Sequence, residues 1–257
     1  MVNLTNTYDS LGRQTDALPL EEEVLWKFRK ILGPEHLSTL AAMNNLASTF
    51  RLLGKHQDAL PLAEEVLEKW QKMLGPDHLN TLIATNTLAN IYHSLGRNKD
   101  ALPLAEEVLE KRRKMLGPDH LDTLMAMNNL MVIYLSLGKH KDALLLVEEV
   151  LEKREKMLGP DHLDTLEAMN NFANTYLLLG RPEEALPLYK KVLDKRRSLL
   201  GSEHQETVHV MYNLLVTLKI LGKGEELKEL AGITLPLIEK VYGSDNTRTV
   251  RIRSLLD

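Results

Sequence analysis

Glycine recurs at a fixed spacing of 42 residues along this chain, and this period constrains the fold more than any other feature of the sequence. One set of glycines comprises Gly33, Gly75, Gly117, Gly159, Gly201 and Gly243, and a second comprises Gly12, Gly54, Gly96, Gly138, Gly180 and Gly222. The segments Pro76–Gly117 and Pro118–Gly159 share 30 of their 42 residues. A period of this length is typical of solenoids, in which each repeat is one supersecondary unit stacked on the next. Because each period contains two glycines, we expect two elements per repeat.

Both parts of the repeat have helical spacing of their apolar residues. The segment "TLMAMNNLMVIYLSLG" places Leu124, Met127, Leu130 and Tyr134 on one side of a helix, and "KDALPLAEEVLEKRRKML" has the same character. The predicted units are approximately 1–33 (with a first helix truncated at Met1), 34–75, 76–117, 118–159, 160–201 and 202–243, followed by a short helix over 244–257. In the last unit, Gly232 is expected to interrupt the second helix. The fold predicted is all-α, a single stack of antiparallel helix pairs, and its N-terminal boundary is typical of a fragment of a longer protein.

Composition excludes several classes of function. Charged residues make up 26% of the chain and nearly balance at a net charge of −4, whereas a nucleic-acid-binding surface is usually basic. The chain has no cysteine, which excludes disulfides, thiolate zinc sites and a thiol nucleophile. No apolar run approaches the roughly 20 residues of a membrane helix, and the N-terminus lacks the features of a signal peptide. We therefore expect a cytoplasmic protein that binds neither nucleic acid nor membrane.

The stretch "KMLGPDHLDTL" occurs at Lys114–Leu124 and again at Lys156–Leu166, and its Asp–His pair raises the question of catalysis or metal binding. The histidine recurs in every junction, as His36, His78, His120, His162 and His204. Stacked helical layers lie roughly 10 Å apart, whereas metal ligands lie about 2 Å from their ion, so these histidines cannot share a metal. Glycine followed by proline is typical of a helix end, and Asp or His can cap the helix that follows. We predict an architectural junction, with no catalytic residue, no metal and no cofactor, and hence a protein that is not an enzyme.

The residue pattern resembles a known repeat family. In "LASTFRLLGKHQDALPLAEEVL" the small residues Ala47 and Ala59 lie where two helices must approach closely, which resembles a tetratricopeptide repeat lengthened to 42 residues. The longer pattern "NNLA…Y…LG…A…L…LG…H" is similar to the kinesin light chain repeats, and more similar still to the repeat domains of fungal NLR-like receptors. Leucine replaces the proline that this pattern has after the histidine, at Leu37, Leu79, Leu121 and Leu163. The resemblance implies a right-handed superhelical solenoid.

It also implies a concave groove lined by the first helix of each pair, whose inward positions form columns of asparagine. The candidate groove residues are Asn44, Asn45, Asn86, Asn90, Asn128, Asn129, Asn170, Asn171, Asn174 and Asn213, with the more variable Arg51, His93, Leu135 and Leu177. Two interpretations remain open. The amides either bond neighbouring helices to one another and fix the stacking, or form a ladder for an extended peptide, since each offers a donor and an acceptor. Groove asparagines in the kinesin light chain family bind the backbones of cargo peptides.

We therefore predict a scaffold that binds a protein or an extended peptide, as the ligand-sensing repeat domain of a fungal NLR-like receptor. The alternatives are a kinesin-light-chain-like cargo adaptor and a structural or self-assembling array without a groove ligand. Trp26 and Trp70 occupy slots that hold charged residues in later repeats. Both slots are therefore expected to be exposed, and the two rings to form an apolar patch through which the N-terminal repeats could self-associate.

Overall fold

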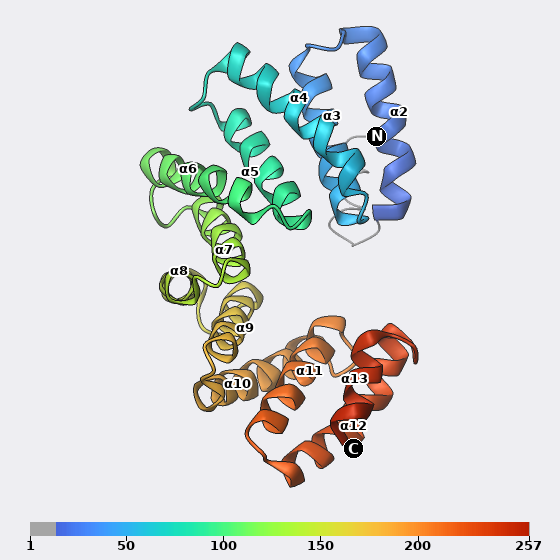
Figure 1. The fold of residues 1–257 in the computed structure, drawn as a ribbon, viewed down its shortest axis with the longest axis vertical. Helices are drawn as coiled ribbons and strands as arrows, with labels where there is room; N and C mark the ends of the chain where they lie inside the picture. The colour runs from blue at the N-terminus through green and yellow to red at the C-terminus, as the bar shows by residue number, and fades with distance from the viewer. Residues whose placement is uncertain (1–13, 257) are drawn as a thin grey trace. The chain divides into compact units, whose positions relative to one another are not determined.

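The structure is a computed structural model that describes residues 14–256, and every regular element in that range is an α-helix (Figure 1). We name the first helix of each repeat A and the second B. The A helices are α3 (Leu37–Leu52), α5 (Leu79–Ser94), α7 (Leu121–Ser136), α9 (Leu163–Leu178), α11 (Gln205–Ile220) and α13 (Thr247–Leu256). The B helices are α2 (Gln14–Leu32), α4 (His56–Leu74), α6 (Asn98–Leu116), α8 (His140–Leu158), α10 (Pro182–Leu200) and α12 (Gly224–Tyr242). The predicted all-α repeat fold is confirmed, whereas the predicted first helix, truncated at Met1, lies outside the described residues.

The contacts divide the chain into two compact units, residues 1–137 (unit 1) and 138–257 (unit 2). Within each unit every described helix packs against the next one along the chain. In unit 1, α5 also contacts both α3 and α7, and in unit 2, α11 contacts both α9 and α13. These additional contacts all join A helices, so the A helices form one layer of each unit and the B helices the other. We call the side of the A layer that is turned away from the B helices the A face.

Glycine ends the helices of both layers by adopting a backbone conformation that other residues disfavour. Gly117 follows α6 with a φ of 89°, and its N–H donates to the carbonyl of Arg113. Gly96 follows α5 with a φ of 73°, and the next residue, Arg97, donates to the carbonyl of Tyr92 at 2.8 Å. Among residues 14–256 every residue with positive φ is a glycine. Glycine adopts this conformation readily because it has no Cβ. The glycines therefore mark the helix ends, which recur with the 42-residue period of the repeat.

The recurring histidine caps the following A helix. In each junction the histidine Nδ1 accepts a hydrogen bond from the backbone N–H two residues later, over 3.1–3.3 Å, at His36, His78, His120, His162 and His204. At the equivalent position before α13 the residue is Asn246, whose Oδ1 accepts from the N–H of Arg248 at 2.9 Å. The slot therefore requires a hydrogen-bond acceptor rather than an imidazole, and the prediction of a helix-capping junction is confirmed.

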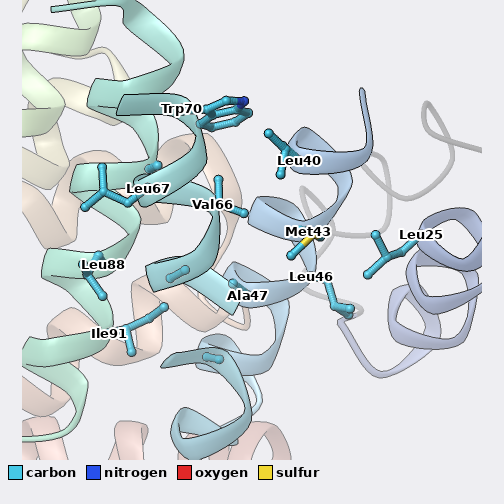
Figure 2. Close-up of a cluster of buried hydrophobic side chains, with 13 residues drawn as sticks. Leu25, Leu40, Met43, Leu46, Ala47, Val66, Leu67, Trp70, Leu88 and Ile91 are labelled. Atoms are coloured by element: carbon cyan, nitrogen blue, oxygen red, sulfur yellow. The ribbon is translucent and has the colours of Figure 1, made fainter. Parts of the chain in front are cut away.

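The core of unit 1 forms where A and B helices interdigitate (Figure 2). Ala47 and Ala59 have no exposed surface, which confirms the predicted close approach. Met43 and Val66 are also completely buried and lie in the same cluster as Trp70. Interdigitation of this kind buries apolar surface at a density close to that of an organic crystal.

Two predictions about particular positions are wrong. Trp70 is only 2% exposed, and the arginines in the equivalent slot, Arg112, Arg154 and Arg196, are 4–6% exposed. Each arginine is buried because its Nη1 donates to a first-turn carbonyl of the next A helix, at 2.7–3.2 Å. Trp26 is 60% exposed, as predicted. Gly232 does not interrupt α12, which is continuous, because tertiary packing overrides a propensity deficit of about 1 kcal/mol.

Candidate functional site: the A faces of the two units

Helical spacing brings the candidate residues of one A helix onto one side. In α5, Ile83, Asn86 and Asn90 are separated by three and four residues and therefore share a face. The 42-residue repeat places Met125, Asn128 and Val132 in the same way on the neighbouring helix α7. The side chains of successive repeats therefore form columns across each A face.

Half of the candidate asparagines bond to one another or to a neighbouring helix. In unit 1, Asn129 Nδ2 donates to Asn86 Oδ1 at 2.9 Å and so joins α7 to α5. In unit 2, Asn213 Nδ2 donates to Asn174 Oδ1 at 3.2 Å and to Asn170 Oδ1 at 3.5 Å, and so joins α11 to α9. The hydroxyl of Tyr189 on α10 also donates to Asn174. For these five residues the structure supports a role in stacking.

The other five candidate asparagines have no side-chain hydrogen-bond partner within residues 14–256. They are Asn44, Asn45, Asn90 and Asn128 in unit 1 and Asn171 in unit 2. Asn44 is only 6% exposed, and the Oδ1 atoms of Asn44 and Asn128 are buried without a donor. Asn45, Asn90 and Asn171 are half-buried at the surface. Uncommitted amides are therefore more numerous in unit 1 than in unit 2.

Exposed apolar side chains adjoin these amides in unit 1. Leu79 and Ile83 on α5 are 43% and 42% exposed, and Leu121 and Met125 on α7 are 53% and 49% exposed. Within each pair the residues are four positions apart and lie one above the other on their helix. We call these four residues the apolar shelf.

The remaining candidates lie at the C-terminal ends of the A helices. Arg51 is half-buried, and burial lowers the pKa of its guanidinium. No acceptor for that guanidinium lies among residues 14–256. The Nδ1 of His93 is 2.7 Å from Asn98 Oδ1, so this histidine bonds to the following B helix. Leu135 and Leu177 are half-buried.

Unit 2 has a polar pocket of about 550 Å³ where unit 1 has its apolar shelf. At the positions equivalent to Ile83 and Met125, unit 2 has Glu167 and His209, and both line this pocket. The other lining residues are Asn170, Asn171, Asn174, Arg196, Gln205, Glu206, Tyr242 and Arg248.

Sequence reasoning missed the two arginines of this pocket. Arg248 occupies the first-turn slot that holds Asp122, Asp164 and Glu206 in earlier repeats, and this reversal of charge was a signal that could have identified it. Arg196 gave no comparable signal, because its position on a B helix predicts a side chain directed away from the A face.

Residues 14–256 contain no group of three or more His, Cys, Asp or Glu side chains arranged to hold a metal ion. None of the helices in that range is long and apolar enough to cross a membrane.

Comparison with known families agrees with the helix-pair architecture. One profile described as tetratricopeptide repeat matches residues 26–72, 53–114 and 86–156, which together span more than half of the chain. A second profile with the same description matches residues 1–38 and 165–206. No match was found among curated proteins.

Solved structures with the same architecture include other repeat proteins. A single-residue variant of a candidate kinesin light chain from Podospora anserina, with nearly identical TPR-like repeats, is 27% identical with a TM-score of 0.70, over 79% of this chain and 96% of that one. BtubC (BKLC) from P. vanneervenii is 17% identical with a TM-score of 0.71, over 91% of this chain and 94% of that one. A Rap protein complexed with competence and sporulation factor is 13% identical with a TM-score of 0.60, over 99% and 85%. At these identities the last two comparisons concern the fold alone.

Proposed function

The chain belongs to the tetratricopeptide repeat family, in its kinesin-light-chain-like type, and we propose that the A face of unit 1 binds an extended peptide or protein segment without catalysing a reaction. The observation that carries this proposal is that uncommitted amides, Asn90 on α5 and the Nδ2 of Asn128 on α7, lie on the same side of their helices as the apolar shelf.

The two parts of this face suit the two parts of a peptide. An extended backbone presents alternating N–H and C=O groups, and an asparagine amide can accept from the first and donate to the second. The side chains of the peptide would cover the apolar shelf, whose residues are now 42–53% exposed to water. Removing apolar surface from water contributes about 25 cal/mol per Å². Arg51, half-buried and without an acceptor among residues 14–256, is suited to an acidic group at one end of the same ligand.

We further propose that this face is the ligand-sensing surface of a fungal NLR-like receptor. The second candidate is a cargo adaptor, which the 27% identity to the Podospora anserina candidate kinesin light chain favours. Both candidates use the same face and the same chemistry. An upstream nucleotide-binding domain in the full-length gene would indicate the receptor, and an upstream heptad coiled coil the adaptor.

The test exchanges equivalent residues between the two units. Peptide display on the wild type selects ligands, and fluorescence anisotropy then measures their Kd for Met125→Glu and for the reciprocal Glu167→Met. Position 125 is 49% exposed and its equivalent in unit 2 is naturally Glu167, so Met125→Glu should fold normally. A carboxylate placed under a covering peptide loses its hydration, so we expect Kd to rise at least about tenfold, or ~1.4 kcal/mol.

Glu167→Met serves as the control and should leave the affinity of the selected peptides unchanged. If Met125→Glu also has no effect while peptides still bind, the ligand site lies elsewhere on the molecule. If display selects no peptide at all, a self-assembling or structural array becomes the better description.

A further inference from the structure

The last A helix, α13, exposes an apolar side chain at a position that is buried in every other described A helix. Val250 is 51% exposed. The equivalent residues are at most 1% exposed and are Leu40, Leu82, Leu124, Leu166 and Val208. In unit 1 the following B helix covers this position, because Leu40 lies in one buried cluster with Val66 and Trp70 of α4 (Figure 2). Val250 is exposed since no B helix follows α13 within residues 14–256.

At the other end of the described range, α2 and α3 leave a groove of about 260 Å³ between them. Val24 and Phe28 of α2 and Ala41 and Ala42 of α3 form its apolar lining. One repeat later, α3 itself packs against both α4 and α5 and so occupies the equivalent place. Ala42 is only half-buried, whereas its equivalents in the later A helices are at most 1% exposed, at Ala84, Ala126, Ala168, Val210 and Ile252. The groove therefore lies where an A helix packs in the later repeats.

The charges at the two ends are also complementary. In interior repeats an acidic residue before the A helix pairs with a lysine of the following B helix. Asp77 Oδ1 lies 2.9 Å from Lys111 Nζ, and Asp161 Oδ2 lies 2.6 Å from Lys195 Nζ. The equivalent acid before α13 is Asp245, which is exposed and has no ion-pair partner among residues 14–256. The equivalent lysine on α2 is Lys27, which pairs there with Glu23 of its own helix.

We infer that α13 of one copy of this chain docks into the groove between α2 and α3 of a second copy. In this arrangement α13 takes the place of an A helix, and α2 serves as the B helix that follows it. Val250 is then covered by apolar side chains of α2, and Asp245 meets Lys27 of the second copy. The inference concerns the ends of the array and does not rest on peptide binding by unit 1.

The contact joins two different surfaces, so each copy can use both at once. Association is therefore head-to-tail and can continue beyond a dimer. It should also be weak, because a helix of ten residues offers a small contact. One position fits less well than the rest. Arg253 occupies the place of the buried Met43, although it can remain paired with Glu239, whose Oε1 lies 2.5 Å from its Nη2.

The first measurement is sedimentation velocity of the whole chain at concentrations up to the millimolar range. The weight-average sedimentation coefficient of the wild type should increase with concentration. Val250→Glu should weaken association at least about tenfold, because the contact would bury a carboxylate among apolar side chains. Ile233→Glu is the matched control and should change the association constant less than twofold. Ile233 is also β-branched and 51% exposed in unit 2, and its equivalents Glu65 and Glu107 already carry the carboxylate.

A charge exchange tests which residues meet. Asp245→Lys and Lys27→Glu should each weaken association by about three- to tenfold, since each places like charges opposite one another. The double variant restores opposite charges and should recover most of the wild-type association constant. Thermal unfolding of each variant verifies that the individual copies remain folded.

A wild type that remains monomeric throughout the concentration range would overturn the inference. Equal association constants for Val250→Glu and Ile233→Glu would also overturn it, as would a double charge variant no better than the single ones. Trp26→Glu should leave this contact unchanged, because Glu110 and Glu152 at the same position stay exposed on B helices of interior repeats. A loss of association in Trp26→Glu alone would assign self-association to a different surface.

Discussion

The A faces of the two units differ at positions that the repeat makes equivalent. Unit 1 has Ile83 and Met125 where unit 2 has Glu167 and His209. Around the first pair, the amides of Asn90 and Asn128 have no partner among residues 14–256, whereas the amides of unit 2 bond mainly to one another. One face is thus suited to an extended apolar segment and the other to a charged group.

This difference shows where a repeat protein can vary without loss of its fold. The junctions of both units use the same glycine conformation and the same capping bond, even where Asn246 replaces histidine. Those positions hold helix ends and cannot change freely. The exposed positions of the A helices neither end nor cap a helix. A few substitutions there therefore change the surface chemistry of each unit without changing its fold.

Buried groups also differ between the units. Thr39, Thr81 and Thr123 in unit 1 each donate to the carbonyl of the glycine that ends the preceding helix, at 2.8 Å. In unit 2 Thr249 makes the same bond to the carbonyl of Gly243, whereas the hydroxyls of Thr165 and Thr207 are buried with no partner within the described residues. Unit 1 therefore has better satisfied junctions than unit 2.

The largest effect on the free energy of unfolding is expected at the repeat position that holds Trp70 in unit 1 and Arg196 in unit 2, a position that Arg112 also occupies in unit 1. Trp70→Ala leaves a cavity in the core of unit 1 and should lower the free energy of unfolding by about 3–5 kcal/mol. Arg196→Met fills the same slot with apolar volume but loses the hydrogen bond to the Glu206 carbonyl and the ion pair with its half-exposed carboxylate, so about 1–2 kcal/mol is expected. Urea unfolding followed by circular dichroism measures both. Similar losses in the two variants would mean that the slot is energetically equivalent in both units.

The burial of this slot could not be predicted from sequence. Charged residues are exposed on average, so Arg112 and its equivalents argued for an exposed Trp70. The guanidinium is buried because it reaches a carbonyl on the next helix, and such a tertiary contact leaves no trace in the local pattern. The helix pairs, by contrast, follow from glycine conformation and apolar spacing, which are local.

The candidate site was only partly predictable for a related reason. Asn129 and Asn90 both occupy inward positions of an A helix and look equivalent in sequence. Asn129 bonds to Asn86, however, while Asn90 has no side-chain partner among residues 14–256. The register of neighbouring helices decides which amides meet, and the repeat pattern does not specify it to within an ångström.

The next largest effect concerns binding to unit 1. Asn90→Ala combined with Asn128→Ala should weaken a selected peptide by about 1–3 kcal/mol, since the groups of the peptide lose their partners in a desolvated groove. Stability should hardly change, because neither amide has an internal partner among residues 14–256. Asn129→Ala is the contrasting variant, which should lower stability by about 1 kcal/mol through loss of the bond to Asn86. Fluorescence anisotropy and thermal unfolding are measured on the same samples. A double variant that loses stability but keeps its affinity for the peptide would contradict the prediction.

A smaller change in stability is expected when the junction threonines are replaced. Thr123→Val should destabilise unit 1 by about 1 kcal/mol, since the carbonyl of Gly117 loses its donor. The same change at Thr165 replaces an unsatisfied buried hydroxyl by a methyl group and should be neutral or stabilising. The two positions share one repeat slot, so volume and backbone are matched. Equal losses at both would indicate that Thr165 has a partner in solution.

The histidine cap should contribute still less. His120→Ala removes the acceptor for the N–H of Asp122 and should cost about 0.5–1 kcal/mol. His120→Asn should retain most of that stability, because Asn246 performs the same task before α13. Zinc should leave the melting temperature of the wild type unchanged, and a stoichiometric increase would instead support a metal site, since binding to the native state stabilises it.

The last expected effect leaves stability unchanged and concerns association through unit 1. Trp26 is 60% exposed, with Lys30 Nζ 5.0 Å from the centre of its ring, and the equivalent residues of later repeats include Glu110 and Glu152. Trp26→Glu therefore gives this slot the residue it has elsewhere, and unfolding should be unaffected. If the ring is a self-association contact, sedimentation velocity should show dimer in the wild type and less of it in the variant. Glu152→Trp, the reciprocal change in unit 2, should not restore the dimer, because the contact depends on the surroundings of α2 and not on an exposed tryptophan alone. A wild type that remains monomeric at high concentration would leave Trp26 as an isolated surface ring stacked under Lys30.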